Sequence, residues 1–481
     1  MTTPLLPDDP HDVRLVANVR PPTWVNPTPA PRYNLVAIGA GAAGLVSAGG
    51  AGGLGAKVAL VERHYLGGDC LIAGCVPSKT LLAAARERPT DFAAVMERVR
   101  RVRADISPHD SAERFRREFG VDVFFGEARF TAPDALEVGG QSLRFRKAVI
   151  ATGSRPVVPD IPGLKDAAPL TNETVFALTH LPRRLTVIGG GPVGCELAQA
   201  FARLGSRVTL LVRGPQLLAK EDEDAARIVE AGLRRDGIDV RFSATVTRVE
   251  AGPPKRVHLG DEAIEADAIL VATGRKPNVE RLNLDAAGIQ VNANGLIVDD
   301  RLRTTNRRVF AAGDVAGAYR FTHAADAMAR LVIRNALFLG RGRLSRLVVP
   351  WCLYTDPEFA RVGLTERAAA ERGVRVDVYR VGFDHVDRAL TDGKTDGFVK
   401  VLTAKGRDRI VGAAVVGAHA GELIGTLSFA MTNRLGLKAI AETVFPYLTY
   451  TEALKTIADT YNRTRLTPFV ARVMRTWLRW T

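Results

Sequence analysis

Two of the chain's four cysteines lie close together, beside residues that could support redox chemistry. Cys70 and Cys75 occur in the stretch GGDCLIAGCVPSKT, positions 67–80, whereas Cys195 and Cys352 lie far from them and from each other. Four cysteines in 481 residues are too few for a secreted scaffold held by disulfides, so we expect a reducing cytoplasm. There, a close cysteine pair indicates redox activity or metal binding. Cys195 and Cys352 are expected to be buried and inert.

The spacing of the pair constrains the local backbone. On a regular helix, residues five apart lie about 7.5 Å apart along the axis and point to different sides, which is beyond disulfide reach. We therefore expect Cys70 on an irregular turn bent back toward Cys75, and a helix that starts near Pro77. A helix N-terminus beside Lys79 would favour thiolates. A structural disulfide and a zinc half-site are the alternatives, and no second cysteine pair completes a zinc site.

The first of two stretches that could position a dinucleotide begins at residue 33. YNLVAIGAGAAGL contains Gly39, Gly41 and Gly44 in a GxGxxG pattern, and KVALVE ends a second strand at Glu62. Gly39 permits a tight turn, Gly41 lets the backbone approach a pyrophosphate, and Gly44 lets the helix pack on the strand. Helix amides would hold the phosphates and Glu62 a ribose diol. The alternative is a tight turn without a ligand.

The second stretch repeats the pattern without the acidic residue. RRLTVIGGGPVGCELAQAFARLGSRVTLLVRG contains Gly189, Gly191 and Gly194, and its second strand ends at Val212, followed by Arg213. An acid at this place favours a free 2′-hydroxyl, whereas an arginine suits a 2′-phosphate. The sequence therefore predicts NADPH rather than NADH. The alternative is that Arg213 is only a solvated loop residue.

Together the motifs resemble the class I pyridine nucleotide–disulfide oxidoreductases, which include dihydrolipoamide dehydrogenase, glutathione reductase and mercuric reductase. The resemblance covers roughly residues 33–460, in order, and rests on GGDCLIAGCVPSK, both GxGxxG units, ATGRKPN, AAGDVAG and YTDPEFARVGLTE. It implies an α/β fold with two Rossmann-like domains, for FAD and NADPH, and a C-terminal α+β dimerisation domain. The protein would be a homodimer with active sites shared across the interface.

The expected domain boundaries follow from the motifs and from changes in composition. They are a flexible proline-rich arm over 1–32, an FAD-binding domain over 33–155 and 280–345, an NAD(P)H-binding domain over 156–279, a dimerisation domain over 346–462 and a basic amphipathic tail over 463–481.

The resemblance also implies roles for single residues. Cys75 would face the flavin, and Cys70 would be the exposed thiol that exchanges with substrate. Lys79 would lie by the flavin N5, paired with Glu196 of GCELA. His323 in FTHAADAMAR matches a family stretch near the flavin, where packing or capping is as open as chemistry. The remaining candidates for cofactor binding are Ala128, Thr152, Gly153, Gly274 and Asp314, the last placed to reach a ribityl hydroxyl.

One segment departs from the disulfide reductases of the family. In TVFPYLTYTEALK, Phe445 stands where those enzymes carry a histidine that moves protons, and no histidine follows His419. Phenylalanine cannot shuttle protons near pH 7. The segment is similar to the mercuric reductase version, which carries over Tyr447 and Glu452. A thiolate pair suits a transiently bound soft ion such as Hg(II), and the same argument extends to Cu and Au ions.

Other departures count against a full match with mercuric reductases. Those enzymes end in a vicinal Cys-Cys, whereas no cysteine follows Cys352 here, and Leu170 replaces a family tyrosine. We therefore expect a mercuric-reductase-like branch with altered substrate delivery. The alternatives are dihydrolipoamide dehydrogenase or another disulfide reductase, and a peripheral membrane quinone reductase.

The charge pattern predicts no nucleic-acid partner. The net charge is +14, but arginines are scattered along the whole chain and no aromatic–basic module of RNA-binding type occurs. The stretch 34–56 is uncharged but rich in glycine and alanine, so we do not expect it to span a membrane. The tail is a basic amphipathic helix that would either contact an anionic membrane or pack on its own protein. Its apolar face comprises Val470, Val473, Met474, Trp477 and Leu478, and its basic face comprises Arg472, Arg475 and Arg479.

Overall fold

The computed structural model describes residues 5–317 and 319–481. Residues 1–4 of the expected arm and residue 318 of the expected FAD-binding domain lie outside the described residues. The chain divides into two compact units. The first comprises Met1–Gly189, Ala200–Thr209 and Thr245–Leu347, and the second comprises Gly190–Gln199, Leu210–Ala244 and Val348–Thr481. This division crosses the segment expected to bind NAD(P)H, so the domain boundaries given above stay predictions.

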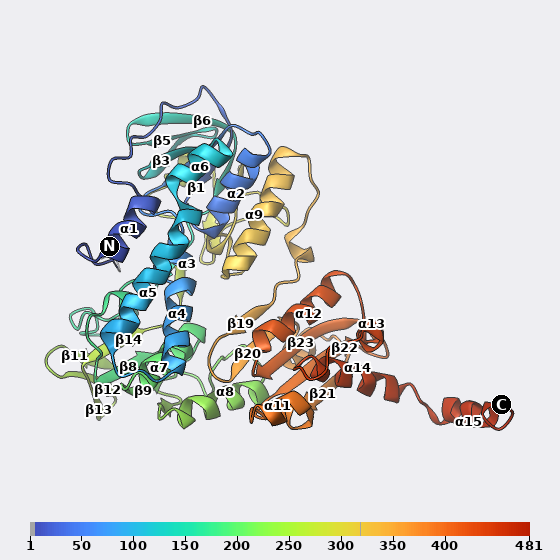
Figure 1. Cartoon of the computed structure of the whole chain (residues 1–481). Helices are drawn as coiled ribbons and strands as arrows, with labels where there is room; N and C mark the ends of the chain where they lie inside the picture. Colours follow the sequence, from blue (N-terminus) through green and yellow to red (C-terminus); the bar gives the residue numbers. More distant parts are fainter. Residues whose placement is uncertain (1–4, 318) are drawn as a thin grey trace. The chain divides into compact units, whose positions relative to one another are not determined.

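A largely parallel sheet forms the centre of the first unit (Figure 1). Its strand β1 (Tyr33–Ile38) pairs in parallel with β2 (Val58–Glu62) on one side and β6 (Gln141–Ile150) on the other. Nearly every residue of β1 is buried, as expected for a strand with neighbours on both sides and helices on the sheet, which explains its continuous apolar run. The strand order is β3-β2-β1-β6-β5-β4, with β18 also paired to β6. The other strands are β3 (Asp122–Phe125), β4 (Ala128–Ala132), β5 (Ala135–Val138) and β18 (Val309–Ala311).

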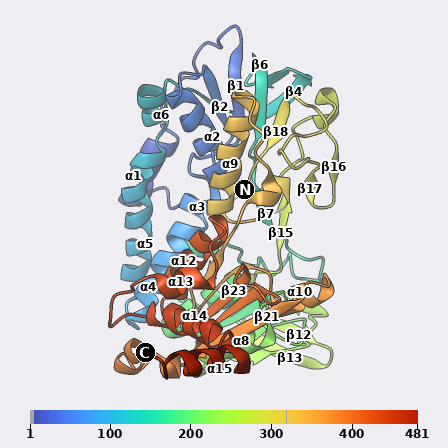
Figure 2. The same cartoon turned by 90° about the vertical axis from the view of Figure 1, so that its right-hand side faces the viewer.

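Helices α2 (Ala42–Gly53) and α9 (Thr322–Leu337) pack against each other and against this sheet (Figures 1 and 2). The uncharged stretch 34–56 thus forms β1 and α2. Within the ranges that the structure describes, no helix is both long and apolar enough to cross a bilayer. The same unit also contains α3 (Gly68–Ile72), α4 (Cys75–Arg86), α5 (Phe92–Ile106), α6 (Ala112–Phe119), η1 (Ser107–Asp110), η2 (Val175–Ala177), η3 (Leu284–Ala287), η4 (Asp314–Ala316) and η5 (Leu344–Arg346).

The N-terminal segment is not a flexible arm, so that prediction was wrong for the residues that form helix α1 (Pro10–Val19). Asp9 caps this helix by accepting hydrogen bonds from the backbone amides of the second and third residues after it, and Pro10 suits the first helical position. Leu15 and Val19 are completely buried, and α1 packs against α5. Proline-rich composition predicted disorder because the apolar positions of α1 are few, but Leu15 and Val19 are part of the hydrophobic core of the first unit.

A second sheet carries the second glycine turn. Its order is β10-β9-β8-β14, and β8 (Arg184–Ile188) pairs in parallel with β14 (Ala268–Val271). Helix α7 (Pro192–Arg203) follows β8 after the glycine-rich turn. Further strands are β7 (Ser154–Pro156), β9 (Arg207–Leu211), β10 (Asp239–Arg241), β11 (Arg248–Glu250), β12 (Lys255–Leu259), β13 (Glu262–Ala266), β15 (Arg275–Pro277), β16 (Val291–Asn292) and β17 (Gly295–Leu296).

The second unit contains an antiparallel sheet without a glycine fingerprint. The strand order is β19-β20-β23-β22-β21, and helices α12 and α14 pack against it (Figures 1 and 2). Its elements are β19 (Trp351–Leu353), β20 (Glu358–Gly363), β21 (Val376–Gly382), β22 (Phe398–Ala404), β23 (Ile410–Gly417), α8 (Glu223–Arg235), α10 (Glu366–Glu371), α11 (Asp387–Thr391), η6 (Phe383–His385), α12 (Ala420–Thr432), α13 (Leu437–Glu442), α14 (Glu452–Thr464) and α15 (Pro468–Trp477).

Candidate active site

The two cysteines lie on two consecutive short helical segments. Cys70 is inside α3, and Cys75 is the first residue of α4. The expected irregular turn at Cys70 is therefore wrong, because the break in the helix occurs later, at Ala73 and Gly74. Gly74 allows the chain to fold back closely, since a Cβ there would lie 2.6 Å from the carbonyl oxygen of Asp69. The second helix starts as predicted, with Pro77 in its first turn.

The two thiols interact with each other in the dithiol form that the structure describes. Their hydrogen bond and the burial of the site raise the pKa of Cys70 well above that of a free cysteine. The sulfur of Cys75 lies 3.4 Å from the hydroxyl oxygen of Thr322, at the start of α9. The helix N-terminus beside Lys79 was expected to favour thiolates, whereas at Cys70 the neighbouring thiol and burial favour the protonated form. Cys75 is the more exposed of the two thiols, and the assignment of Cys75 to the flavin and of Cys70 to the substrate stays a prediction.

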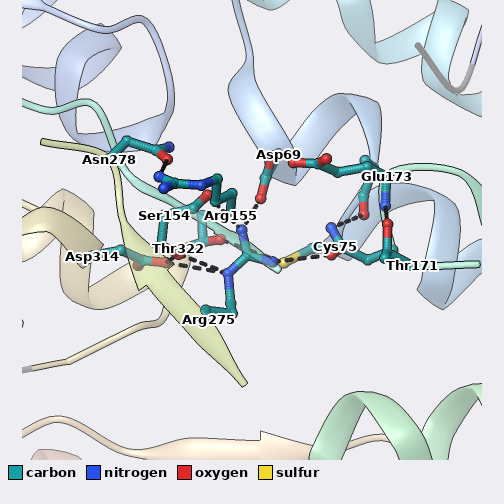
Figure 3. Close-up of polar contacts among 12 residues, drawn as sticks. Asp69, Cys75, Ser154, Arg155, Thr171, Glu173, Arg275, Asn278, Asp314 and Thr322 are labelled. Carbon is teal, nitrogen blue, oxygen red and sulfur yellow. Dashed lines mark hydrogen bonds and ion pairs between the residues drawn. The ribbon is translucent and has the colours of Figure 1, made fainter. Parts of the chain in front are cut away.

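Arg275, which sequence reasoning missed, joins the cysteine segment to the turn after β6 (Figure 3). Its guanidinium forms an ion pair with Asp69, the residue before Cys70, and donates a hydrogen bond of 2.7 Å to the hydroxyl of Ser154. Ser154 in turn donates a hydrogen bond of 2.5 Å to the carboxylate of Asp314. The signal for Arg275 lies in ATGRKPN, where this arginine directly follows Gly274. One cation therefore connects three separate segments around the thiols.

Thr152 and Asp314 follow the carboxyl ends of the neighbouring parallel strands β6 and β18. Asp314 begins η4 directly after β18, as predicted, but its carboxylate contacts Ser154 and Arg275. Thr152 donates a 2.6 Å hydrogen bond to the backbone of Asn278 and accepts one of 2.9 Å from the side chain of the same residue. Gly153 and Gly274 have left-handed φ values of +66° and +142°, and Ala128 is the buried first residue of β4. His323 is exposed and its ring stacks on Phe321 at 5.5 Å.

The first glycine turn has the shape that a pyrophosphate requires. Gly39 has φ +99°, and a Cβ there would lie 2.5 Å from the carbonyl oxygen of Ala151. A Cβ at Gly44 would lie 1.7 Å from the carbonyl oxygen of Gly39, so the helix approaches the strand closely. Gly41 caps α2 without a side-chain hydrogen bond, which leaves the first amides of the helix open to an anion. These residues fit the pyrophosphate of FAD.

Glu62 has structural contacts in addition to its predicted role. Its two carboxylate oxygens accept hydrogen bonds of 2.7 Å from the backbone amides of Ala40 and His64. Burial raises the pKa of Glu62, and these amides oppose that rise. The carboxylate therefore ties the glycine turn to the end of β2, and ribose binding by Glu62 stays a prediction.

The second glycine turn is built in the same way. Gly189 has φ +121°, and a Cβ there would lie 2.4 Å from the carbonyl oxygen of Ala272, whereas Gly191 faces open space. Gly194 is buried within α7, and Val212 is buried directly after β9. Arg213 is exposed, and its side chain makes no hydrogen bond or ion pair with any residue that the structure describes. Its guanidinium is therefore available to an anionic ligand.

The two predicted residues of the segment TVFPYLTYTEALK, Tyr447 and Glu452, lie around a cavity of about 290 Å³. Its lining includes Phe445, Tyr447 and Glu452. The hydroxyl of Tyr447 donates a 3.1 Å hydrogen bond to Asp387, which raises the pKa of Tyr447, and Glu452 accepts a hydrogen bond of 3.3 Å from the backbone of Asp387. Asp387 gave no sequence signal, because it lies 60 residues before Tyr447 and in no motif.

Glu196 is buried in α7 and accepts a 3.0 Å hydrogen bond from the backbone amide of Tyr354. Lys79 is half-buried on α4, and its pairing with Glu196 stays a prediction. Cys195 is fully buried, and burial raises its pKa to about 12, as expected of an inert thiol. Cys352 is only half-buried, because it lies on β19 at the end of the sheet order.

Two glycine turns, each between a strand and a helix, together with a close thiol pair define a flavoprotein oxidoreductase that uses two dinucleotides. Residues 33–329 match the family model described as "Pyridine nucleotide-disulphide oxidoreductase", and residues 349–458 match its dimerisation domain. The chain belongs to the class I pyridine nucleotide–disulfide oxidoreductases, as the motifs predicted. The mixed α/β fold with two Rossmann-like domains and the C-terminal dimerisation domain is likewise confirmed.

The relatives include enzymes with different substrates. A mercuric reductase of Bacillus cereus is 36% identical over 482 residues, covering 95% of this chain and 76% of that protein. A dihydrolipoyl dehydrogenase of Chlamydia muridarum is 31% identical and covers 87% of this chain and 95% of that protein. The Cu(II) complex of the HOCl-induced flavoprotein disulfide reductase RclA from Escherichia coli has a TM-score of 0.83 at 30% identity, covering 90% of this chain and 100% of that one.

These findings establish the class of the enzyme. It is an FAD-binding, NAD(P)H-dependent oxidoreductase, and its dimerisation domain indicates a homodimer. The names of its relatives indicate both metal-ion and disulfide substrates. The substrate of this chain must therefore be inferred from its own residues.

Proposed function

We propose that the protein is an NADPH-dependent flavoenzyme that reduces a thiophilic metal ion, foremost Hg(II), at Cys70 and Cys75. The observation that carries the proposal is the contact between the two thiols, which are close enough to share a hydrogen bond and so to bind one ion between them. Thiolate sulfur is a soft ligand that prefers soft ions.

The reaction balances without any other reactant. NADPH gives up a hydride, the metal ion takes two electrons, and the products are NADP⁺, one proton and elemental mercury. FAD, when bound, accepts the hydride equivalent and passes two electrons to the site of the thiols. The two cysteines lose their protons as they bind the ion, because only thiolates are strong ligands. The raised pKa of Cys70 therefore makes ion binding stronger as pH rises.

The segment around Phe445 supports a metal ion over a disulfide. Reduction of a disulfide substrate needs a proton for each departing thiolate, and imidazole is suited to deliver it. Phe445 lines the cavity with Tyr447 and Glu452, and no histidine lines it. The mercuric reductases among the relatives and the Cu(II) complex of RclA show that members of this family are associated with such ions. We propose that this cavity meets the thiols of the partner subunit in the homodimer and is the route of the ion.

A disulfide is the second candidate substrate, favoured by one observation. Dihydrolipoyl dehydrogenase and a disulfide reductase are among the relatives at 30% identity or slightly more. In the absence of an imidazole the proton would have to come from water or from Tyr447, so turnover would be slow. A third possibility, direct reduction of a quinone by the flavin, would not need Cys70 and Cys75.

The deciding experiment measures NADPH oxidation and mercury vapour with Hg(II), and NADPH oxidation with lipoamide and glutathione disulfide, under the same anaerobic conditions. We expect Hg(II) to be reduced faster than either disulfide. Cys70→Ser and Cys75→Ser should abolish this activity, whereas Cys195→Ala, the matched cysteine outside the site, should retain it. Rapid lipoamide turnover without mercury release would reject the metal ion. Full activity of Cys70→Ser with a quinone would favour the third possibility.

We also propose that helix α15 contacts an anionic membrane surface. It has no buried residue, and its Phe469 and Trp477 are 74% and 69% exposed, while Trp480, which follows the helix, is 86% exposed. No acidic residue follows Asp459, while five arginines do, so the apolar face lies within a purely basic segment. Exposed tryptophan beside arginine suits the interface of an anionic bilayer. The rest of the enzyme would lie in the cytoplasm, where NADPH is available and cysteines stay reduced.

A further inference from the structure

The N-terminal helix α1 is connected to the cysteine-bearing helix α3 through one buried arginine. Arg103 on α5 donates a hydrogen bond of 2.9 Å to the carboxylate of Asp12 on α1. The same guanidinium donates a hydrogen bond of 3.0 Å to the carbonyl oxygen of Ile72, the last residue of α3. Ile72 is the second residue after Cys70, with only Leu71 between them. The planar fork of an arginine can hold two acceptors in fixed directions at the same time.

This contact is fully removed from water. The side chains of Arg103 and Asp12 are 0% and 1% exposed. The second carboxylate oxygen of Asp12 accepts a hydrogen bond of 2.8 Å from the backbone amide of Leu6, so the chain before α1 also takes part. Removing one partner from a buried ion pair leaves a buried charge without compensation, so a change at Asp12 must affect Arg103, and a change at Arg103 must affect Asp12.

The cysteine segment is also held at its other end by α1. The carbonyl oxygen of Val19, the last residue of α1, accepts a 3.1 Å hydrogen bond from the amide of Leu66, four residues before Cys70. The guanidinium of Arg20 donates hydrogen bonds of 2.5 and 2.8 Å to the carbonyl oxygens of Arg63 and His64. The N-terminal segment thus contacts the chain before α3 directly and the end of α3 through Arg103.

The carbonyl groups at the end of α3 are bound by donors from outside the helix. The last carbonyl groups of any helix lack partners within the helix. In α3 the carbonyl of Ile72 is bound by Arg103, and that of Ala73 accepts a 3.1 Å hydrogen bond from the side chain of Asn172. A helix of five residues is too short to hold its own geometry, so these external donors determine where α3 ends and where Cys70 lies.

We infer that Asp12 and Arg103 are positioning residues that set the placement of Cys70 relative to Cys75, and thereby the stability of the disulfide between them. Disulfide formation needs a narrow range of distances and directions. A shift of α3 would change the equilibrium between the dithiol and the disulfide without touching either sulfur. The inference rests on the proposed redox role of the two thiols, but it concerns their equilibrium and not the substrate.

The test measures the disulfide equilibrium of the purified FAD-containing enzyme against glutathione, in the absence of NADPH and metal. In this exchange two glutathione molecules are oxidised for each disulfide that is reduced, and the thiols are counted by alkylation and mass spectrometry. We compare Asp12→Asn, Asp12→Ala and Arg103→Lys. Arg103→Lys retains the charge but has no planar fork, so it cannot hold both acceptors as arginine does. Arg14→Ala is the control, since Arg14 on the same helix forms an exposed ion pair with Asp105 and does not contact α3.

We expect the equilibrium constant to change at least tenfold in Asp12→Ala and Arg103→Lys, less in Asp12→Asn, and not in Arg14→Ala. Measurements at a temperature at which every variant is folded, checked by circular dichroism, separate this effect from stability. If Asp12→Ala does not fold, Asp12→Asn and Arg103→Lys decide the question. Equilibrium constants equal to that of the unchanged enzyme, in variants with a lower melting temperature, would show that α1 only stabilises the fold and would overturn the inference. Because no metal reaction is measured, failure of the proposed substrate would leave this result intact.

Discussion

Arg275 and Asp69 form an ion pair that joins strand β15 to the helix carrying Cys70. Burial raises the pKa of Asp69, and the charge of Arg275 opposes this rise. In Arg275→Met the pKa of Asp69 should rise further, because only burial and the negative charge of Asp314 would remain. Both partners are partly exposed, so we expect the free energy of unfolding to fall by only about 1–2 kcal/mol. Urea denaturation measures this loss.

The same variant should affect the thiols. Without Arg275, α3 loses its connection to Ser154, and we expect slower reduction of the site by NADPH. Arg320→Met serves as a control, because Arg320 donates its hydrogen bond to the backbone carbonyl of Arg275 and not to the side chain. Equal rates in Arg275→Met and in the unchanged enzyme would show that the ion pair has no role in the chemistry.

A second prediction concerns the titration of Cys70. Its pKa is raised first by the hydrogen bond that its thiol donates to Cys75 and then by burial. Cys75→Ala removes the first cause, so the pKa of Cys70 should fall and its thiolate fraction at pH 7 should increase. Alkylation of Cys70 by iodoacetamide should therefore be faster in Cys75→Ala than in the reduced enzyme, and the difference should disappear at a pH high enough to ionise Cys70 in both proteins. Slower alkylation in the variant at pH 7 would contradict the assigned cause.

Arg213 provides a test of nucleotide preference. A charge-assisted contact with a 2′-phosphate contributes about 1.5–3 kcal/mol, which corresponds to roughly tenfold to a hundredfold discrimination. We expect kcat/KM for NADPH to exceed that for NADH by this factor, and Arg213→Glu to reverse the preference. Arg207→Glu, a matched change at the exposed start of the same strand, should leave it unchanged. An unaltered ratio in Arg213→Glu would reject this residue as the phosphate ligand.

Tyr447 is the polar hydroxyl of the cavity that contains Phe445. If it assists a charged metal species, Tyr447→Phe should slow metal reduction by about 1–2 kcal/mol in the activation free energy, or about fivefold to thirtyfold. The first half-reaction, in which NADPH reduces the enzyme, should keep its rate in stopped-flow experiments. Tyr450→Phe is the matched control, since Tyr450 also donates to an aspartate, Asp392, but does not line the cavity. A slower first half-reaction in Tyr447→Phe would point to a structural effect.

Helix α15 should determine association with lipid. The protein should co-sediment with vesicles that contain phosphatidylserine at low salt and be released at high salt, because the attraction to anionic lipid is screened. Deletion of residues 468–481 should abolish binding and leave NADPH oxidation intact. Trp477→Ala should weaken binding at all salt concentrations, whereas Arg475→Gln should mainly reduce its salt sensitivity. Binding that persists after the deletion would place the contact elsewhere, and binding by neither form would reject the membrane.

The features that could be predicted from the sequence are those that depend on neighbouring residues. Gly39 and Gly189 need left-handed backbone at the ends of buried strands, and Pro77 fits only a first helical turn, so the patterns locate both nucleotide turns and the start of α4. The pairing of Asp12 with Arg103 depends on residues 91 apart, and nothing in the order of the residues brings them together. The raised pKa of Cys70 could not be predicted either, because its causes, burial and the contact with Cys75, depend on packing in three dimensions.

The hydrogen bonds of Glu62 have a consequence for the assembly of the active enzyme. Both carboxylate oxygens bind amides of the protein itself, so the first glycine turn is closed by internal contacts and does not need a ligand to take its shape. A preformed loop loses little conformational entropy when the ligand arrives. Apoprotein should then capture FAD in one bimolecular step whose rate is proportional to FAD concentration, with no slow concentration-independent phase. Glu62→Gln would keep the shape of the side chain but lose an acceptor, and such a slow phase should emerge during reconstitution.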